Sequence, residues 1–520
     1  MRSHKVCIAA LTLLFLFLAV PRLYFFDLEH GDDYQDADVL NAGRNFLILG
    51  FRECRFLPVL NAGQETAENA YTHFPPLPMI INGLLRLVFG TDSLFFFRCG
   101  ALFFSLLHLL AWYAFIFMLF GDRRAALVSS LLYLTNPFFL FGFDSVSSIN
   151  LADGFRVFML LCFVSAARQK GVWRRRAVIL LWLVSVLAAL ISFEYIVYMV
   201  LFYALYRFWL RPGEKFPTLG VFLFLTSAPV AGFLLHLAQN AWYFGSFAEA
   251  VGDLSSSALE RMGGVKEIPL AHRSFTGWFS QVIVKNVNLT VLPGGFLLLL
   301  SGFSAYLGYQ AVPPEKRGAA QEMFRLFVVL LACGMTWYVL FPAHSLAHAF
   351  IFLFTRHLVP AGALFLTLVF MILLFVIEGR QRLRVLKKIA WGMSLCAACA
   401  WGVLRSQVPV TKEKILHSDD FRSFKQCLGV LRAGSREKDT VGLNYHRMPF
   451  ISYYTQRRCL RIFDGASLEA QDTIPRYFIW FPHRERGAMA LLEELQRYYD
   501  KMYECRSVRF PSVFFERREQ

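Results

Sequence analysis

Long apolar stretches alternate with short polar segments over roughly the first 405 residues of the chain. Several stretches reach the ~20 residues with which a helix crosses a bilayer. Unbroken apolar runs favour helices, because the strands of membrane barrels alternate apolar and polar residues. The pattern predicts about eleven spanning helices, over 5–26, 93–120, 125–143, 153–168, 177–193, 195–210, 217–241, 290–309, 323–342, 355–378 and 387–405.

Residues 75–90 are apolar but too short for a full span. If they crossed the membrane, the basic segment 121–124 would fall on the outer side. We therefore expect an interfacial or re-entrant helix there. Residues 1–20 resemble a signal peptide, but no small-residue cleavage site follows, so they are interpreted as part of a retained first helix.

The composition agrees with a membrane protein. Of the 520 residues 56% are hydrophobic and 17% are charged, and the mean hydropathy is +0.46, whereas soluble domains carry about 25% charged residues. The sequence thus predicts a polytopic α-helical membrane protein.

The net charge of +16 is concentrated in short loops between the apolar runs, at 121–124, 168–176, 211–215, 313–317 and 379–388. Such loops face the cytoplasm under the positive-inside rule. This predicts a protein of the cell (inner) membrane with a cytoplasmic N-terminus and an outer C-terminus. A nucleic-acid partner is the weaker interpretation of the charge, and we expect none.

The chain changes character after the membrane part, 1–405. Residues 406–520 contain short strand-like segments at 440–446, 459–465 and 476–482, and amphipathic stretches at 421–434 and 485–502. These predict a small α/β domain on the extracytoplasmic side. Cys427, Cys459 and Cys505 lie in this region, where a disulfide can form after export, but the sequence leaves the pairing open.

Four segments share the predicted outer face: 27–92, 143–153, 240–288 and 341–356. Their convergence would form an outward-facing cavity suited to a lipid-bound substrate. Within them, residues 252–264 are small, polar and glycine-containing, and a mobile loop is expected there.

A carboxylate pair, Asp32 and Asp33, follows the first apolar run within about two helical turns. Ionised groups so close to hydrocarbon often mark a working site. The alternative is a solvated loop at the membrane edge.

The order of this pair, a helix ending at Gly50 and the motif Tyr-Thr-His-Phe-Pro-Pro-Leu at 71–77 resembles the GT-C superfamily of membrane glycosyltransferases. The protein O-mannosyltransferase and lipid A aminoarabinose transferase branch is the most similar. That branch usually has Glu where this chain has Asp33. Softer similarities lie at 134–161, 239–250 and 344–360, and the resemblance covers roughly residues 5–380.

The resemblance implies a transferase that takes a sugar from a polyprenyl-phosphate lipid and passes it to a lipid, glycan or protein acceptor at the outer face. Asp32 would deprotonate the acceptor hydroxyl, with Asp33 in support. Asp153 fits the second acidic position of the family, and Asp144 is the alternative. Asp153 could instead stabilise a helix N-terminus.

The leaving lipid phosphate needs cations or hydrogen-bond donors. The candidates on the outer face are His73, Arg98, His344, His348, Arg356 and His357, of which Arg356 and His357 are favoured because a guanidinium suits phosphate. Alternatives stay open for several residues. Arg98 could extend only to the lipid headgroups. His344 and His348 could form a metal pair, although the sequence shows no third ligand nearby. Glu194 could be a structural residue at a turn or a carboxylate of the site.

No metal or other cofactor is predicted, although Asp32 and Asp153 could hold Mg²⁺ or Mn²⁺. A lipid or glycan transporter or flippase, and a catalytically silent GT-C relative, are the competing functions. Transporters tend to carry polar residues near the bilayer midplane and to show repeated halves. Here the polar residues gather at one face, which favours the transferase.

Overall fold

The computed structural model describes residues 2–24, 26–27, 33–63, 66–67, 70–210, 216–259, 314–341, 355–379, 384–444, 448–462, 474–482, 488–505 and 511–518. Within this part of the chain, six helices are long and apolar enough to cross a membrane: 4–24, 94–120, 150–168, 219–244, 317–340 and 356–375. The protein is therefore a polytopic helical membrane protein. The predicted span 290–309 lies outside the described residues.

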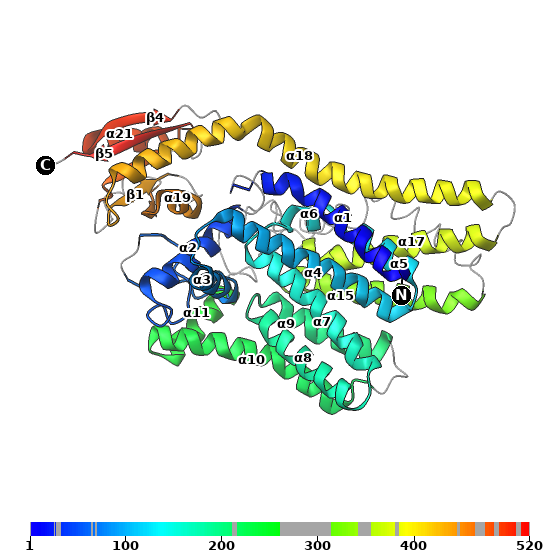
Figure 1. The fold of residues 1–520 in the computed structure, drawn as a ribbon. Coiled ribbons are helices and arrows are strands. Elements are labelled where there is room, and N and C mark those ends of the chain that lie inside the picture. The colour runs from blue at the N-terminus through cyan, green and yellow to red at the C-terminus, as the bar shows by residue number, and fades with distance from the viewer. Residues whose placement is uncertain are drawn as a thin grey trace.

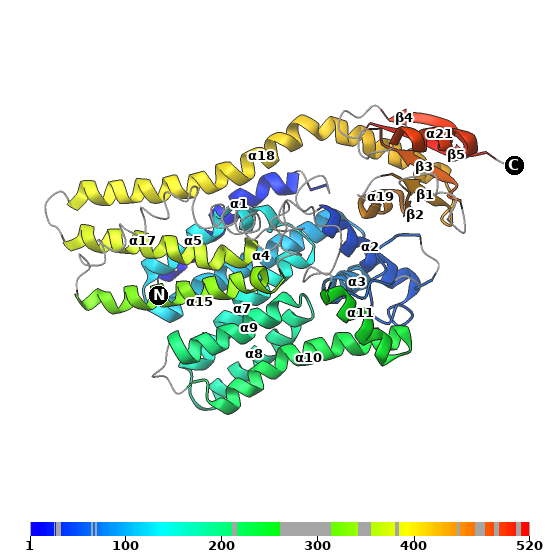
Figure 2. The same ribbon diagram turned by 180° about the vertical axis from the view of Figure 1, so that it is seen from behind.

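The long helices run roughly along one axis and form a bundle (Figures 1 and 2). They are α1 (Arg2–Tyr24), α4 (Leu94–Phe120), α7 (Ser148–Arg168), α8 (Gly171–Ala189), α9 (Glu194–Leu205), α10 (Leu219–Phe244), α15 (Pro314–Leu340), α17 (Val359–Gly379) and α18 (Arg384–Gly434). A continuous apolar core joins α1, α4, α7, α8, α9, α15 and α17. Outward-facing apolar side chains, such as Leu13 and Phe17 on α1 and Leu234 and Leu235 on α10, are exposed, as expected for contact with lipid.

Two of the predicted spans differ from the structure. The span expected at 125–143 is broken into α5 (Arg123–Leu134) and α6 (Pro137–Gly142). The side chain of Asn136 accepts a hydrogen bond from Phe138 N at 3.0 Å, and Pro137 begins the new helix, so the sequence carries a helix start inside the apolar run. The span expected at 195–210 comprises α9 and the π-helical turn η1 (Tyr206–Leu210).

The segment predicted to be the first outer segment, residues 27–92, contains two helices at the end of the bundle that also carries the sheet (Figure 1). These are α2 (Asp33–Leu49) and α3 (Leu77–Phe89), and α11 (Phe247–Leu259) lies beside them. Helices α2 and α3 cross closely, since a Cβ atom on Gly43 would lie only 2.1 Å from Asn82 Oδ1. The 13-residue α3 packs on α2, in the place where a short helix was predicted.

The prediction of a mobile loop over 252–264 is wrong for the residues of that range that the structure describes. Residues 252–259 are the second half of α11, and residues 260–264 lie outside the described residues. Small and serine-rich composition suggested a loop. Helix α11 instead gains its position from packing against α10 and from the polar contacts of Asp253.

Helix α18 is a single helix of 51 residues. It joins the predicted span 387–405 to the predicted helix 421–434. The helix therefore continues through residue 405, where the sequence predicted the end of the membrane part. By the usual helical rise it extends about 75 Å, from the basic end of the bundle to the sheet (Figure 2).

The tail forms a five-stranded sheet with the order β2-β1-β3-β5-β4. Strand β1 pairs in parallel with β2 and β3, whereas β5 pairs antiparallel with β3 and β4. The strands are β1 (Thr440–Leu443), β2 (Arg458–Arg461), β3 (Tyr477–Trp480), β4 (Tyr499–Cys505) and β5 (Ser512–Arg517), with helices α19 (Met448–Thr455) and α21 (Ala488–Tyr498). A disulfide between Cys427 and Cys505 ties α18 to β4, whereas Cys459 is free and buried.

The sheet and the first outer segment share one core. Ala37 and Leu40 of α2 pack in the same apolar cluster as Phe424 of α18 and Phe450 of α19. Asn61 adds polar contacts to β2, because its amide donates to Cys459 O at 2.6 Å and accepts from Cys459 N at 3.0 Å. The tail therefore braces the segment that contains the carboxylate pair.

Candidate functional site

A buried group of charged and aromatic side chains joins three helices of the bundle. Asp153 and Arg156 come from α7, Glu194 and Tyr195 from the start of α9, and Arg356 and His357 from the 3₁₀ turn η6 (Thr355–Leu358). We call these six residues the Asp153 cluster. Buried charges are stable only when they are paired and hydrogen-bonded.

Asp153 is the centre of this cluster. Its Oδ1 accepts hydrogen bonds from Arg156 Nη2 at 3.0 Å and from the Tyr195 hydroxyl at 3.2 Å. Its Oδ2 lies 3.7 Å from Arg356 Nη1. Helix α7 begins at Ser148, so Asp153 lies beyond the first turn, where the helix dipole acts most strongly. Its environment is that of an ion-pair network, which weakens the alternative interpretation as a helix-capping carboxylate.

The cluster also determines the proton position on His357. Arg156 Nη1 lies 3.2 Å from His357 Nδ1, and a guanidinium can only donate. Nδ1 is therefore the acceptor, and the proton sits on Nε2, which donates to Glu194 Oε2 at 2.5 Å. Both ring nitrogens are engaged, so His357 orients its neighbours in this arrangement. Glu194, for which a structural role had been the favoured prediction, belongs to the cluster.

A second buried group lies where α2 meets the chain before α7. Arg98 Nη1 lies 2.7 Å from Asp36 Oδ2 and donates to Asp144 O at 2.8 Å. Asp36 Oδ1 accepts from the Ser145 hydroxyl at 2.7 Å and from Ser147 N at 2.9 Å. Burial raises the pKa of the Asp36 carboxyl, and the Arg98 guanidinium opposes that rise. We call Asp36, Arg98, Asp144, Ser145 and Ser147 the Asp36 cluster.

The Asp36 cluster brings the start of α2 against the start of α7. Asp33 is the first residue of α2, one turn before Asp36, and Ser147 immediately precedes α7. The first residue of α2, Asp33, therefore begins that helix near the start of the helix that carries Asp153. The guanidinium of Arg98 is buried in contact with Asp36 and Asp144, so the alternative in which it only reaches for lipid headgroups does not describe its position.

The motif at 71–77 is held between α10, α11 and the end of α8. His73 Nε2 lies 2.8 Å from Asp253 Oδ1, and Thr72 Oγ1 donates to Asp253 Oδ2 at 2.7 Å. The side chain of Asn240 donates to Thr72 O at 3.0 Å. Leu77 N donates to Leu190 O at 3.3 Å, close in sequence to Glu194. The motif is therefore fixed to the end of α8, to α10 and to α11.

Several predicted site residues have no described side chain. Asp32, His344 and His348 lie outside the described residues, and the side chain of Asp33 is not described. Among the candidates that are described, the structure brings Asp153, Arg356 and His357 together. It places His73 and Arg98 in two other polar groups, His73 with Asp253 and Arg98 with Asp36.

Sequence reasoning missed Arg156, Tyr195 and Asp36. Arg156 carried a usable signal, because it is a charge inside an apolar helix, three residues after Asp153. Asp36 lies in the acidic run 32–38, and nothing in the sequence distinguishes it from the other carboxylates of that run. Its role depends on Arg98, which is 62 positions away in the sequence (36 to 98).

No group of three or more His, Cys, Asp or Glu side chains that could hold a metal ion occurs in the part of the chain that the structure describes. The oxygens of Asp153 already face two guanidiniums. The pairing of Asp32 with Asp153 around a divalent ion includes a residue outside that part and stays untested.

No protein-family model matches the sequence, and no curated protein matches it. Solved structures do match. The crystal structure of ArnT from Cupriavidus metallidurans bound to undecaprenyl phosphate aligns over 97% of this chain and 97% of its own, with a TM-score of 0.64 and 13% identity. The apo structure of the same protein aligns over 98% of both chains, with a TM-score of 0.54 and 14% identity.

The chain therefore has the fold of these ArnT structures. The resemblance found in the sequence is thereby confirmed for the fold. The match covers nearly the whole chain, so it includes the C-terminal sheet as well as the bundle. At 13–14% identity the likeness shows the fold alone.

Proposed function

We propose that the protein is a glycosyltransferase that uses a polyprenyl-phosphate-linked sugar as its donor. The observation that carries this proposal is the buried Asp153 cluster on α7, a helix whose start is held against α2 by Asp36, within a GT-C fold. The ArnT of similar fold binds undecaprenyl phosphate. The acceptor would be a lipid, glycan or protein at the outer face.

In this proposal the first outer segment performs the chemistry. Asp32 takes the proton of the acceptor hydroxyl, and the oxygen attacks the anomeric carbon of the sugar. The bond between that carbon and the phosphate oxygen breaks, and polyprenyl phosphate leaves. Asp33, one turn before Asp36 in α2, supports the base. The Asp36 cluster holds this turn in place.

The Asp153 cluster would receive the phosphate. Arg356 is the proposed contact, because it is the arginine of the cluster with a partly accessible side chain, 9% exposed against 0% for Arg156. A guanidinium stabilises the charge that grows on the departing phosphate. Asp153, Arg156 and His357 are positioning residues that fix the orientation of Arg356. This role for His357 departs from the phosphate contact predicted from the sequence.

The charges of the cluster explain why an anion can be accepted. With a neutral His357, the two guanidiniums offset the carboxylates of Asp153 and Glu194. Balanced charges keep the empty site stable in a region of low dielectric. An approaching phosphate can then compete with Asp153 for Arg356, whose Nη1 atom is 3.7 Å from the carboxylate, beyond hydrogen-bond distance.

The chemistry proposed here uses no resident metal. The carboxylate of Asp153 is committed to Arg156 and Tyr195, and a divalent ion would have to displace them. The guanidinium of Arg356 can supply the positive charge that a metal would otherwise provide.

The test is transfer from a radiolabelled polyprenyl-phosphate sugar in membranes that contain the protein. Asp32→Asn keeps the shape of the side chain and removes the base, so transfer should fall about 100-fold or more. Asp33→Asn should cost less. Survival of full activity in Asp32→Asn would refute the base. If the wild type transfers no sugar to envelope lipids, glycans or proteins, the result would favour a catalytically silent relative. Movement of the labelled lipid without transfer would favour a flippase.

A further inference from the structure

Helix α15 packs against the turn η6, which carries Arg356 and His357, and Gly334 lies at the contact. Gly334 is buried in the interior of α15. A Cβ atom on Gly334 would lie 2.7 Å from His357 O and 2.8 Å from Leu358 Cδ2. Ordinary contacts between a carbon and a carbonyl oxygen are about 3.3 Å or longer. Any side chain at position 334 would therefore displace either α15 or the turn.

The backbone of α15 does not itself require a glycine at this position. Gly334 lies in a regular helix and does not have a positive φ. Glycine inside a helix is less favourable than alanine, because it loses more conformational freedom on folding. The close approach to His357 O, rather than the local conformation, is thus what requires the absence of a side chain.

The turn η6 is also held from α7, through Arg156. The Nη2 atom of Arg156 donates to Arg356 O at 3.2 Å, and its Nη1 atom lies 3.2 Å from His357 Nδ1. Both contacts are buried. The backbone of η6 therefore has defined contacts with α7 and with α15. A displacement of the turn at His357 O would change the hydrogen bonds that join it to the Asp153 cluster.

The side chain most sensitive to such a displacement is that of Arg356. Its Nη1 atom lies 3.7 Å from Asp153 Oδ2, just beyond hydrogen-bond distance. A shift of the turn by a few tenths of an ångström, on the scale that separates a contact from a hydrogen bond, would change how tightly Arg356 pairs with this carboxylate. It would thereby change how well the guanidinium can bind an anion.

We propose that Gly334 is a positioning residue for the phosphate contact at Arg356. The absence of a side chain lets α15 approach η6 closely. The turn then holds the guanidinium at the distance from Asp153 at which a lipid phosphate can compete for it. This inference rests on the proposed function, in which Arg356 contacts the phosphate of the donor.

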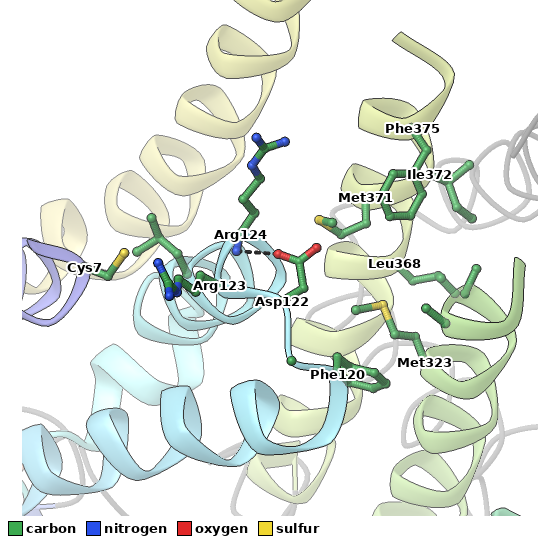
Figure 3. Close-up of a pocket in the computed structure, with 14 residues that line it drawn as sticks. Cys7, Phe120, Asp122, Arg123, Arg124, Met323, Leu368, Met371, Ile372 and Phe375 are labelled. Carbon is green, nitrogen blue, oxygen red and sulfur yellow. Dashed lines mark hydrogen bonds between the residues drawn. The ribbon is translucent and has the colours of Figure 1, made fainter. Parts of the chain in front are cut away.

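A matched control lies in the same helix. Gly318 is exposed near the start of α15, and a Cβ atom there would meet nothing within 4 Å in the part of the chain that the structure describes. The next residues of α15 line a pocket of about 720 Å³, and Figure 3 shows Met323 of α15 and Leu368 of α17 among its walls. Gly318→Ala therefore adds a methyl group to α15 where there is room for it.

Binding of radiolabelled undecaprenyl phosphate to the purified full-length protein tests the proposal. Gly334→Ala should weaken binding about 10-fold, as expected when a hydrogen bond to a charged group is misaligned. Gly318→Ala should bind as tightly as the wild type. Arg356→Gln should also weaken binding about 10-fold. Adding Gly334→Ala to Arg356→Gln should then have little further effect, because Gly334 acts through Arg356.

Gly334→Ala/Leu358→Val removes the Leu358 Cδ2 atom from the contact and leaves His357 O in place. It should bind about 10-fold more weakly than Leu358→Val alone, and it carries the test if thermal unfolding shows that Gly334→Ala does not fold. Equal affinities of Gly334→Ala and Gly318→Ala, or losses that multiply in Gly334→Ala/Arg356→Gln, would overturn the proposal. A wild type that neither binds undecaprenyl phosphate nor transfers sugar would refute the proposed function, and this inference with it.

Discussion

Arg156 and His357 are in direct contact although 201 positions separate them, with Nη1 of the arginine 3.2 Å from Nδ1 of the imidazole. The contact places the imidazole proton on Nε2, toward Glu194. A site that must hold a lipid phosphate against a sugar needs such fixed geometry, since small displacements of reacting groups can cost about 100-fold in rate. Several consequences can be measured.

His357→Gln is expected to retain more activity than His357→Ala. The glutamine amide nitrogen can replace Nε2 as the donor to Glu194, whereas alanine leaves a buried carboxylate without that donor. We expect a loss of about 10-fold for glutamine and about 100-fold for alanine. Initial rates with varied donor concentration measure this. Equal losses in the two variants would argue against a positioning role.

Arg98→Gln is expected to destabilise the protein by about 3–5 kcal/mol, because it leaves the buried carboxylate of Asp36 without its cation. Asp36→Asn should cost less, since burial already raises the pKa of this carboxyl and favours its neutral form. The double variant should be more stable than the sum of the single effects predicts. Thermal unfolding in one detergent gives all three values. If Arg98 bound phosphate instead, Arg98→Gln would raise KM at unchanged unfolding temperature.

A chelator is expected to leave transfer unchanged. The guanidiniums around Asp153 provide the positive charge in the proposed site, and the carboxylate has no room for a metal without losing Arg156. Activity is measured after dialysis against EDTA and again after addition of Mg²⁺ or Mn²⁺. Loss of activity with EDTA and recovery with either ion would require Asp32 and Asp153 to act as metal ligands.

Non-reducing peptide mapping should recover Cys427 linked to Cys505 and should leave Cys459 as a thiol. Burial raises the pKa of the Cys459 thiol to about 12, so this cysteine should resist alkylation at pH 8 until the protein is denatured. Reduction of the disulfide should lower stability by about 2–4 kcal/mol. A linked Cys459 would contradict the arrangement. Recovery of the linked pair from cells would support export of the sheet, because such bonds persist in oxidising compartments.

The stretches that became α4 and α17 could be predicted from the sequence, because an apolar run of about 20 residues is a local property. The break before α6 was readable in principle from Asn136 and Pro137. It was missed because the surrounding run is apolar on both sides. The continuity of α18 was not predicted, because residues 406–420 are polar and separate the apolar span from the amphipathic stretch that follows.

The sequence by itself determined that the chain spans a membrane, and that basic segments and a carboxylate pair lie between its apolar runs. These features reside in neighbouring residues. Only the tertiary structure decided that Asp153 meets Arg156, Arg356 and His357, and that Asp36 meets Arg98. Such pairings depend on how helices pack across long separations in the chain, and burial then makes each charge stable only beside its partner.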